Sequence, residues 1–217
     1  MYRFGEDSVE KMVSWALEYA HPSTAPSILE VGTGNGTLLF ALLDAEYLPE
    51  RLQGIDYSPG SIKLAKSIAT TRGGHKISFH LCDFLNEDPP TLPQGPQQSS
   101  ADWDLIMDKG TFDAIALMEK DSSGIAPADG YPPKIARLLK PGGHFLITCT
   151  LPIEYICISQ HLTILFEACN FTEEELRSKF VNIQTGLVYH SRIQHATFTF
   201  GGKSGSICSS VAFQKPS

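Results

Sequence analysis

The chain has 217 residues, of which 42% are hydrophobic and 19% are charged, so it is long enough and apolar enough to form one globular domain. Its 24 acidic and 17 basic residues give a formal net charge of −7, which argues against nucleic-acid binding, because phosphate neutralisation needs clustered lysine and arginine. The five cysteines form no CxxC pair and the seven histidines show no ligand spacing, so we expect no metal site.

The same features indicate a cellular setting. Residues 1–11 carry five charged side chains, which is not typical of a secretory signal, and no uncharged apolar stretch is long enough to span a bilayer. An odd and scattered set of cysteines is typical of reduced thiols. We therefore expect a monomeric protein of the cytoplasm or nucleus that does not bind membranes.

Helices and short buried strands alternate along the first two thirds of the chain. Apolar residues at helical spacing predict a first helix from Val9 to Ala20, which Asp7 caps and His21-Pro22 ends. Ser58 and Pro59 have the residue types of an N-cap and a first helical position, so another helix is expected to begin there. The strands predicted in this part cover residues 27–31, 52–56, 77–81, 104–107 and 144–148, and the other helices cover 36–43 and 134–139, the latter closed by Pro141-Gly142-Gly143.

This alternation predicts an α/β fold of the Rossmann-like, doubly wound type, in which a mostly parallel sheet has helices on both faces. The last third differs, because a helix near 172–180 is followed by β-rich runs at 187–200 and 206–214, which suggest an antiparallel ending. Residues 86–102 are rich in Pro, Gln and Ser and predict a surface loop. We expect residues 1–217 to form a single domain.

A glycine-rich loop, Glu30-Val31-Gly32-Thr33-Gly34-Asn35-Gly36, joins the first strand to the next helix. Asp56 ends the second strand, where a carboxylate can accept hydrogen bonds from both ribose hydroxyls of an adenosine. The spacing is GxGxG rather than the GxGxxG of dinucleotide enzymes, and Glu30 would repel a phosphate but attract a cation such as the sulfonium or amino group of S-adenosylmethionine. This cofactor is favoured over NAD and over a tight turn without a ligand.

Further candidates follow the third strand. Asp83 could accept a hydrogen bond from the adenine amino group, and Phe84 or Tyr57 could pack on the adenine ring, because this end of the strand faces the same crevice. In the structural alternative, Asp83 caps a turn and Phe84 belongs to the core.

The segment Asp108-Lys109-Gly110-Thr111-Phe112-Asp113 follows the fourth strand. This position puts Asp108 beside the cofactor crevice, where it is a candidate for cofactor binding and for catalysis, facing the methyl acceptor. Thr111 is a second catalytic candidate and can cap a helix that runs to Leu117. In the alternative, the segment is only a polar loop and a capped helix.

The chemistry of methyl transfer limits what these residues must do. A lysine with a pKa near 10.4 is almost wholly protonated at pH 7, and freeing its amine costs about 4–5 kcal/mol. A sulfonium is itself a good electrophile, so proximity and alignment can supply much of the rate. We therefore assign no single general base.

These residues resemble the class I, seven-β-strand methyltransferases that use S-adenosylmethionine, and most closely the elongation factor 1-alpha lysine methyltransferases. The resemblance implies a seven-stranded sheet with a reversed last strand, and a lysine of translation elongation factor 1-alpha as the substrate. It also implies that Gly32, Gly34 and Asp56 hold the cofactor, with Phe4, Thr33 and Gly36 beside them. The segments that carry it are Phe4-Gly5-Glu6-Asp7-Ser8, residues 30–36 with 54–59, residues 108–113, and residues 198–205.

The chain departs from the family pattern at two places. Arg3 stands where the family usually has Trp, and residues 150–168 form a mostly apolar segment that family members tend to lack. We interpret residues 150–168 as an inserted segment. Two alternatives therefore stay open: a methyltransferase that acts on another protein or a small molecule, and a catalytically silent adaptor with a methyltransferase fold.

Overall fold

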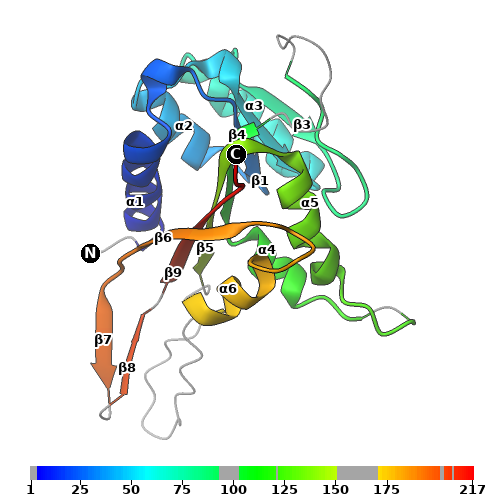
Figure 1. The fold of residues 1–217 in the computed structure, drawn as a ribbon. Helices are drawn as coiled ribbons and strands as arrows, with labels where there is room; N and C mark the ends of the chain where they lie inside the picture. The colour runs from blue at the N-terminus through cyan, green and yellow to red at the C-terminus, as the bar shows by residue number, and fades with distance from the viewer. Residues whose placement is uncertain (1–3, 93–102, 121, 151–170, 201–202, 207) are drawn as a thin grey trace, which may run out of the picture.

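Seven strands form a mixed sheet at the centre of the molecule (Figure 1). The computed structural model describes residues 4–92, 103–120, 122–150, 171–200, 203–206 and 208–217. The strand order is β3-β2-β1-β4-β5-β9-β6; the first five are parallel, and β9, the last strand in the chain, runs antiparallel to both β5 and β6. The predicted doubly wound sheet with a reversed last strand is confirmed.

The strands of the sheet are β1 (Ile28–Val31), β2 (Leu52–Asp56), β3 (Ser78–Leu81), β4 (Trp103–Lys109), β5 (Leu139–Thr150), β6 (Val188–Ile193) and β9 (Cys208–Gln214). A separate hairpin of β7 (Thr197–Phe200) and β8 (Lys203–Ser206) extends away from the sheet in Figure 1. The helices are α1 (Phe4–Tyr19), α2 (Thr37–Asp44), α3 (Pro59–Thr71), α4 (Thr111–Ala116), α5 (Tyr131–Leu138) and α6 (Glu173–Phe180). Three short 3₁₀ turns, η1 (Pro22–Thr24), η2 (Pro49–Arg51) and η3 (Pro127–Gly130), lie between them.

Helices cover both faces of the sheet, as predicted (Figure 1). On one face α1, α2 and α3 bury a cluster that includes Met12, Phe40 and Ile62 against the sheet. On the other face α4, α5 and α6 bury a more aromatic cluster that includes Phe112 and Phe180. Within the described residues, no helix is both long and apolar enough to cross a membrane.

Several predicted boundaries need correction. The first helix begins at Phe4, so Asp7 is not its N-cap; it lies inside α1 and pairs with Lys11 at 2.9 Å, one turn later. Residues 141–143 were predicted to close the helix over 134–139, but they lie within β5. The amide of Gly142 donates to the Lys215 carbonyl, and the carbonyl of Gly143 accepts the Lys215 amide, just beyond β9. Ser58 caps α3 as predicted and accepts a hydrogen bond from the Ser61 amide.

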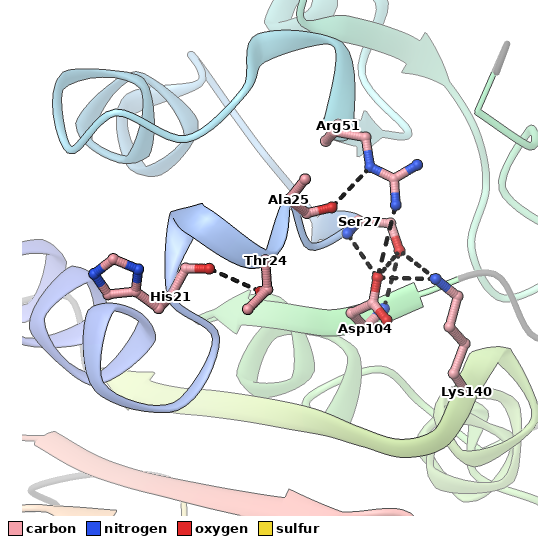
Figure 2. Close-up of polar contacts among 7 residues, drawn as sticks. All are labelled: His21, Thr24, Ala25, Ser27, Arg51, Asp104 and Lys140. Carbon is pink, nitrogen blue, oxygen red and sulfur yellow. Dashed lines mark hydrogen bonds and ion pairs between the residues drawn. The ribbon is translucent and has the colours of Figure 1, made fainter. Parts of the chain in front are cut away.

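A polar cluster joins three strands at the amino edge of the sheet (Figure 2). The amide and hydroxyl of Ser27, just before β1, donate to the Asp104 carboxylate of β4 at 2.8 and 2.7 Å. Lys140 of β5 donates to the same carboxylate at 2.8 Å, and Arg51 lies 3.9 Å from it. We call Ser27, Arg51, Asp104 and Lys140 the amino-edge clamp; it lies at the opposite edge from the predicted site.

Two expectations concern residues that are not described. The predicted surface loop over 86–102 extends beyond the described residues after Leu92, and the inserted segment lies outside them after Thr150.

Candidate active site

The predicted site residues meet at the carboxyl edge of the sheet. Val31 pairs with Ile55 and Asp108 on its two sides, and Asp56 pairs with Leu81. The loops that follow β1, β2, β3 and β4 therefore start at one level of the sheet, where open α/β sheets bind their ligands.

The glycine-rich loop packs closely against the next loop along this edge. Gly32 has a φ of +69°, and a Cβ built there would lie 1.8 Å from the Thr111 hydroxyl oxygen, so only glycine fits. Gly34 has a φ of +55° but has open space where its side chain would be. Gly36 directly precedes α2 and also has a positive φ, of +82°. The backbone is thus closed at Gly32 and accessible at Gly34, which suits a loop that wraps a ligand.

Asp56 ties this loop to the end of β2. One carboxylate oxygen accepts the Gly34 amide at 2.9 Å and the other accepts the Ser58 amide at 2.8 Å. Because each oxygen can accept two hydrogen bonds, both keep a free acceptor site, and the side chain is 8% exposed. Asp56 therefore fits the two neighbouring hydroxyls of a ribose.

Glu30 is a buried carboxyl group below the glycine loop, 2% exposed. Burial raises its pKa to about 8, since the hydrogen bond from Thr33 at 2.6 Å and the charge of Lys109 offset only part of the desolvation. A buried acid of this kind gains most from a cation placed next to it. Glu30 and Thr33 therefore fit the positively charged end of S-adenosylmethionine.

Asp108 lies at the carboxyl end of β4, as predicted, but its carboxylate points into the protein. It is fully buried and accepts hydrogen bonds from the amides of Thr111 and Phe112 at 2.7 and 3.0 Å and from the Tyr131 hydroxyl at 2.5 Å. Burial nevertheless raises its pKa to about 7. In this structure the side chain caps α4 and holds its loop, and a role facing the methyl acceptor stays a prediction.

Thr111 also has a different role from the predicted one. Gly110 occupies the N-cap position of α4, and Thr111 does not cap the helix with its side chain. Its hydroxyl donates to the Val31 carbonyl at 2.9 Å and lies against Gly32. Thr111 thus joins the loop after β4 to the glycine-rich loop, because the Asp108 carboxylate already supplies the helix cap.

Tyr131 is a residue of the site that the sequence analysis missed. It is fully buried at the start of α5, and its hydroxyl donates to Asp108. Because 23 residues separate Tyr131 from Asp108, no motif spacing signals the pair.

The predicted adenine contacts differ in how accessible they are. Tyr57 is 80% exposed next to Asp56. Asp83 is exposed, and its carboxylate accepts the Leu85 amide and the Asn86 side chain at 3.1 and 2.7 Å, as a turn cap does. Phe84 is 5% exposed and packs edge-on against Tyr131, which favours the alternative in which Phe84 is a core residue.

The Phe4 side chain lies outside the described side chains. Within the described part of the chain, no cluster of histidine, cysteine and acidic side chains could hold a metal ion.

Comparisons with known proteins agree with this arrangement. The family described as "Methyltransferase domain" matches residues 23–197. The protein-lysine N-methyltransferase efm4 of Schizosaccharomyces pombe is 36% identical over 97% of this chain and 82% of its own length, and the human EEF1A lysine methyltransferase 2 is 34% identical over 98% and 75%. The structure of the N-methyltransferase NodS from Bradyrhizobium japonicum, in complex with S-adenosyl-L-homocysteine, has the same fold, with a TM-score of 0.63 at 20% identity over 99% of this chain and 89% of that one. The chain therefore belongs to the family of the EEF1A lysine methyltransferases.

Proposed function

We propose that this protein is an S-adenosylmethionine-dependent protein-lysine N-methyltransferase and that its substrate is a lysine of translation elongation factor 1-alpha. The observation that carries the proposal is that relatives named for this reaction align with nearly the whole chain, the glycine-rich loop and Asp56 included. The acidic net charge of −7 also suits a basic protein partner.

In this proposal the carboxyl edge of β1 and β2 holds the cofactor. Asp56 accepts both ribose hydroxyls, the open backbone at Gly34 lies along the amino-acid portion, and Glu30 faces the positive charge. Tyr57 is exposed beside the ribose position and can cover the adenine ring. S-adenosylmethionine, when bound, supplies a methyl group on a sulfonium that leaves as a neutral thioether.

The protein must align a neutral lysine amine with that methyl group. Since deprotonating lysine at pH 7 costs about 4–5 kcal/mol, a dry site that disfavours the ammonium ion lowers this cost. Asp108 contributes as a positioning residue: its three hydrogen bonds fix the loop that packs on Gly32 through Thr111. Catalysis then depends mainly on proximity and alignment.

A catalytically silent adaptor is less well supported, because a protein without cofactor has no need of a buried acid with a raised pKa at Glu30 next to an open glycine loop. Methyl transfer to a different protein uses the same chemistry, so it is a separate outcome of the test below.

Transfer of a labelled methyl group tests the proposal. The purified protein is incubated with tritiated S-adenosylmethionine and a cell lysate, and labelled bands are identified by mass spectrometry. We expect label on a lysine of elongation factor 1-alpha, and none with the D56A variant. Label on another protein would contradict the substrate, and no label together with no cofactor binding would contradict the activity.

A further inference from the structure

A cavity of about 420 Å³ lies at the same edge of the sheet as the proposed cofactor site, and the function proposed above leaves it unassigned. Its described lining comes from the start of α6, the end of β6 with the residues after it, and the start of β9. The lining residues that matter here are Glu173, Arg192, His195, Cys208, Ser209 and Ser210. The volume is in the range of sites that bind ligands.

The register of the sheet places this cavity at the same edge as the cofactor loops. Lys109 of β4 pairs with Thr148 of β5, Thr148 pairs with Ser210 of β9, and Ser210 pairs with Ile193 of β6. Directly paired residues point to the same face of a sheet. Lys109, Thr148, Ser210 and Ile193 therefore form a row across the sheet, from the end of β4 to the wall of the cavity. The loop after β4 joins this row, because the Gly110 amide donates to the Thr148 carbonyl at 2.9 Å.

A chain of hydrogen bonds connects the cavity wall to this row. The Thr148 and Ser210 hydroxyls are 2.7 Å apart, and the Ser210 hydroxyl lies 2.7 Å from His195 Nε2. Thr148 is fully buried and Ser210 is 2% exposed, so both hydroxyls are shielded from water. His195 is half-buried and is held in a fixed orientation at the cavity end of this chain.

The charges in the cavity are balanced. Arg192 donates to Glu173 at 3.0 Å, so the two charged groups of the lining satisfy one another. Burial, helped by the charge of Lys11 and opposed by Asp7, lowers the pKa of His195, so the imidazole is neutral at pH 7. The remaining lining comes from Ile193, Gln194, Cys208, Ser209 and Ser210, none of which is charged. Such a surface suits an uncharged, hydrogen-bonding ligand rather than an ion.

We propose that this cavity binds the polypeptide stretch next to the target lysine of the protein substrate, through main-chain amides and one small neutral side chain, and that His195 is a specificity-determining residue for it. The proposal rests on the proposed function. β6 is the terminal strand of the seven-stranded sheet, and β9 and β5 separate it from β4, which is roughly 14 Å away at about 4.8 Å per strand. A substrate segment that occupies the cavity can therefore place a lysine at the cofactor only if that lysine lies several residues further along the extended chain.

Two variants and a control test this assignment. H195A removes the hydrogen-bonding group, and S209W fills the cavity from its wall; H75A removes an exposed histidine just before β3, at the far end of the sheet. We expect the KM for elongation factor 1-alpha to rise at least tenfold in H195A and S209W, while the Kd for S-adenosylmethionine stays within twofold. H75A should leave both values within twofold. H195Q keeps a hydrogen-bonding side chain, so its KM should lie between the values for the wild type and H195A.

The outcomes separate this inference from the proposed function. If the wild-type protein methylates the factor and both cavity variants keep its KM, the cavity assignment is overturned and the function stands. If the cavity variants also lose affinity for S-adenosylmethionine, the inference is overturned, because the cavity would then serve the cofactor site. If they change the sedimentation coefficient and leave the KM unchanged, it is overturned as well, because the cavity would then be a contact between copies. If the wild type transfers no methyl group to any protein, the proposed function is overturned, and with it the inference that rests on it.

Discussion

Three carboxylates at one sheet edge differ in what surrounds them, and these surroundings assign their roles. Asp56 keeps two free acceptor sites, Glu30 is buried with a raised pKa, and Asp108 is fully buried and accepts three hydrogen bonds from the protein. The first two are therefore suited to a ligand, and the third is suited to holding a loop.

Removing the Asp56 carboxylate should weaken cofactor binding far more than it weakens the fold. Each charge-assisted hydrogen bond to a ribose hydroxyl contributes roughly 1.5–3 kcal/mol, so loss of two such bonds in D56A should lower the affinity for S-adenosylmethionine by roughly 10²- to 10⁴-fold. Isothermal calorimetry measures the affinity, and circular dichroism checks the fold. An affinity within threefold of the wild type would remove Asp56 from the cofactor site.

Glu30 should make the stability of the ligand-free protein depend on pH. Its pKa is about 8 in the folded state and 4.5 in the unfolded state, so the folded state binds the proton more tightly and loses stability as pH rises between these values. E30Q removes this loss, and at pH 8 it should be more stable than the wild type by roughly 1–4 kcal/mol, with little difference near pH 5.

The measurement is urea denaturation at both pH values, with cofactor affinity as a second readout. We expect E30Q to bind S-adenosylmethionine more weakly although it is more stable at pH 8. Equal stability of the two proteins across this range would show that Glu30 does not titrate as described.

Tyr131 should stabilise the Asp108 loop without touching the cofactor. Y131F removes the hydroxyl that donates to a buried carboxylate, and loss of a hydrogen bond to a charged group costs about 1.5–3 kcal/mol. The free energy of unfolding should fall by that amount, whereas Kd for S-adenosylmethionine should change less than threefold. A variant as stable as the wild type would mean that Asp108 needs only its two backbone partners.

Residue types and spacing were sufficient to place Glu30, Asp56 and the glycine-rich loop at one edge of the sheet, because each lies in or next to a short buried strand. The direction of the Asp108 side chain could not be predicted in this way. It depends on Tyr131 from another helix, and on the close approach of Thr111 to Gly32, which only the folded chain creates.

Among the elements, the start of α3 was predicted correctly from a local signal, whereas the start of α1 and the extent of β5 were not. The Ser58-Pro59 pair marks the start of α3 correctly because capping is a local interaction. The extent of β5 through Pro141-Gly142-Gly143 depends on pairing with Lys215, more than 70 residues later, so local turn residues were misleading. The start of α1 was missed because Asp7 has the residue type of a cap but pairs with Lys11 inside the helix.

The amino-edge clamp should stabilise the sheet and leave the cofactor site unchanged. Burial alone would raise the pKa of Asp104, but the hydrogen bonds from Lys140 and Ser27 outweigh burial and lower it. The contribution of Asp104 to the free energy of unfolding is therefore lost only as pH falls below the ordinary pKa of aspartate. D104A should lower the free energy of unfolding by about 1–3 kcal/mol at pH 7, less so near pH 3.

Asp44 provides a matched control for this variant. Its ion pair with Arg72 is more exposed, so D44A should change stability by no more than about 0.5 kcal/mol. Cofactor affinity should stay within twofold in both variants. If D104A weakened cofactor binding as strongly as it weakened the fold, the two edges of the sheet would be coupled.

At the scale of the whole molecule, the sheet order brings the parts of the proposed enzyme together. The parallel strands β1 and β2 carry the cofactor loops, β4 carries the loop that supports them, and the antiparallel β9 brings the cavity to the same edge. The alternating strands and helices of the sequence predict the parallel half. The family resemblance implied that the last strand is reversed, and only the structure placed it between β5 and β6.

A crystal structure with S-adenosylhomocysteine tests the central claim most directly. We expect both ribose hydroxyls within hydrogen-bonding distance of the Asp56 carboxylate, and the amino-acid portion along Gly34 above Glu30. Density for the nucleoside at any other place, with Asp56 still bonded only to the amides of Gly34 and Ser58, would contradict the account.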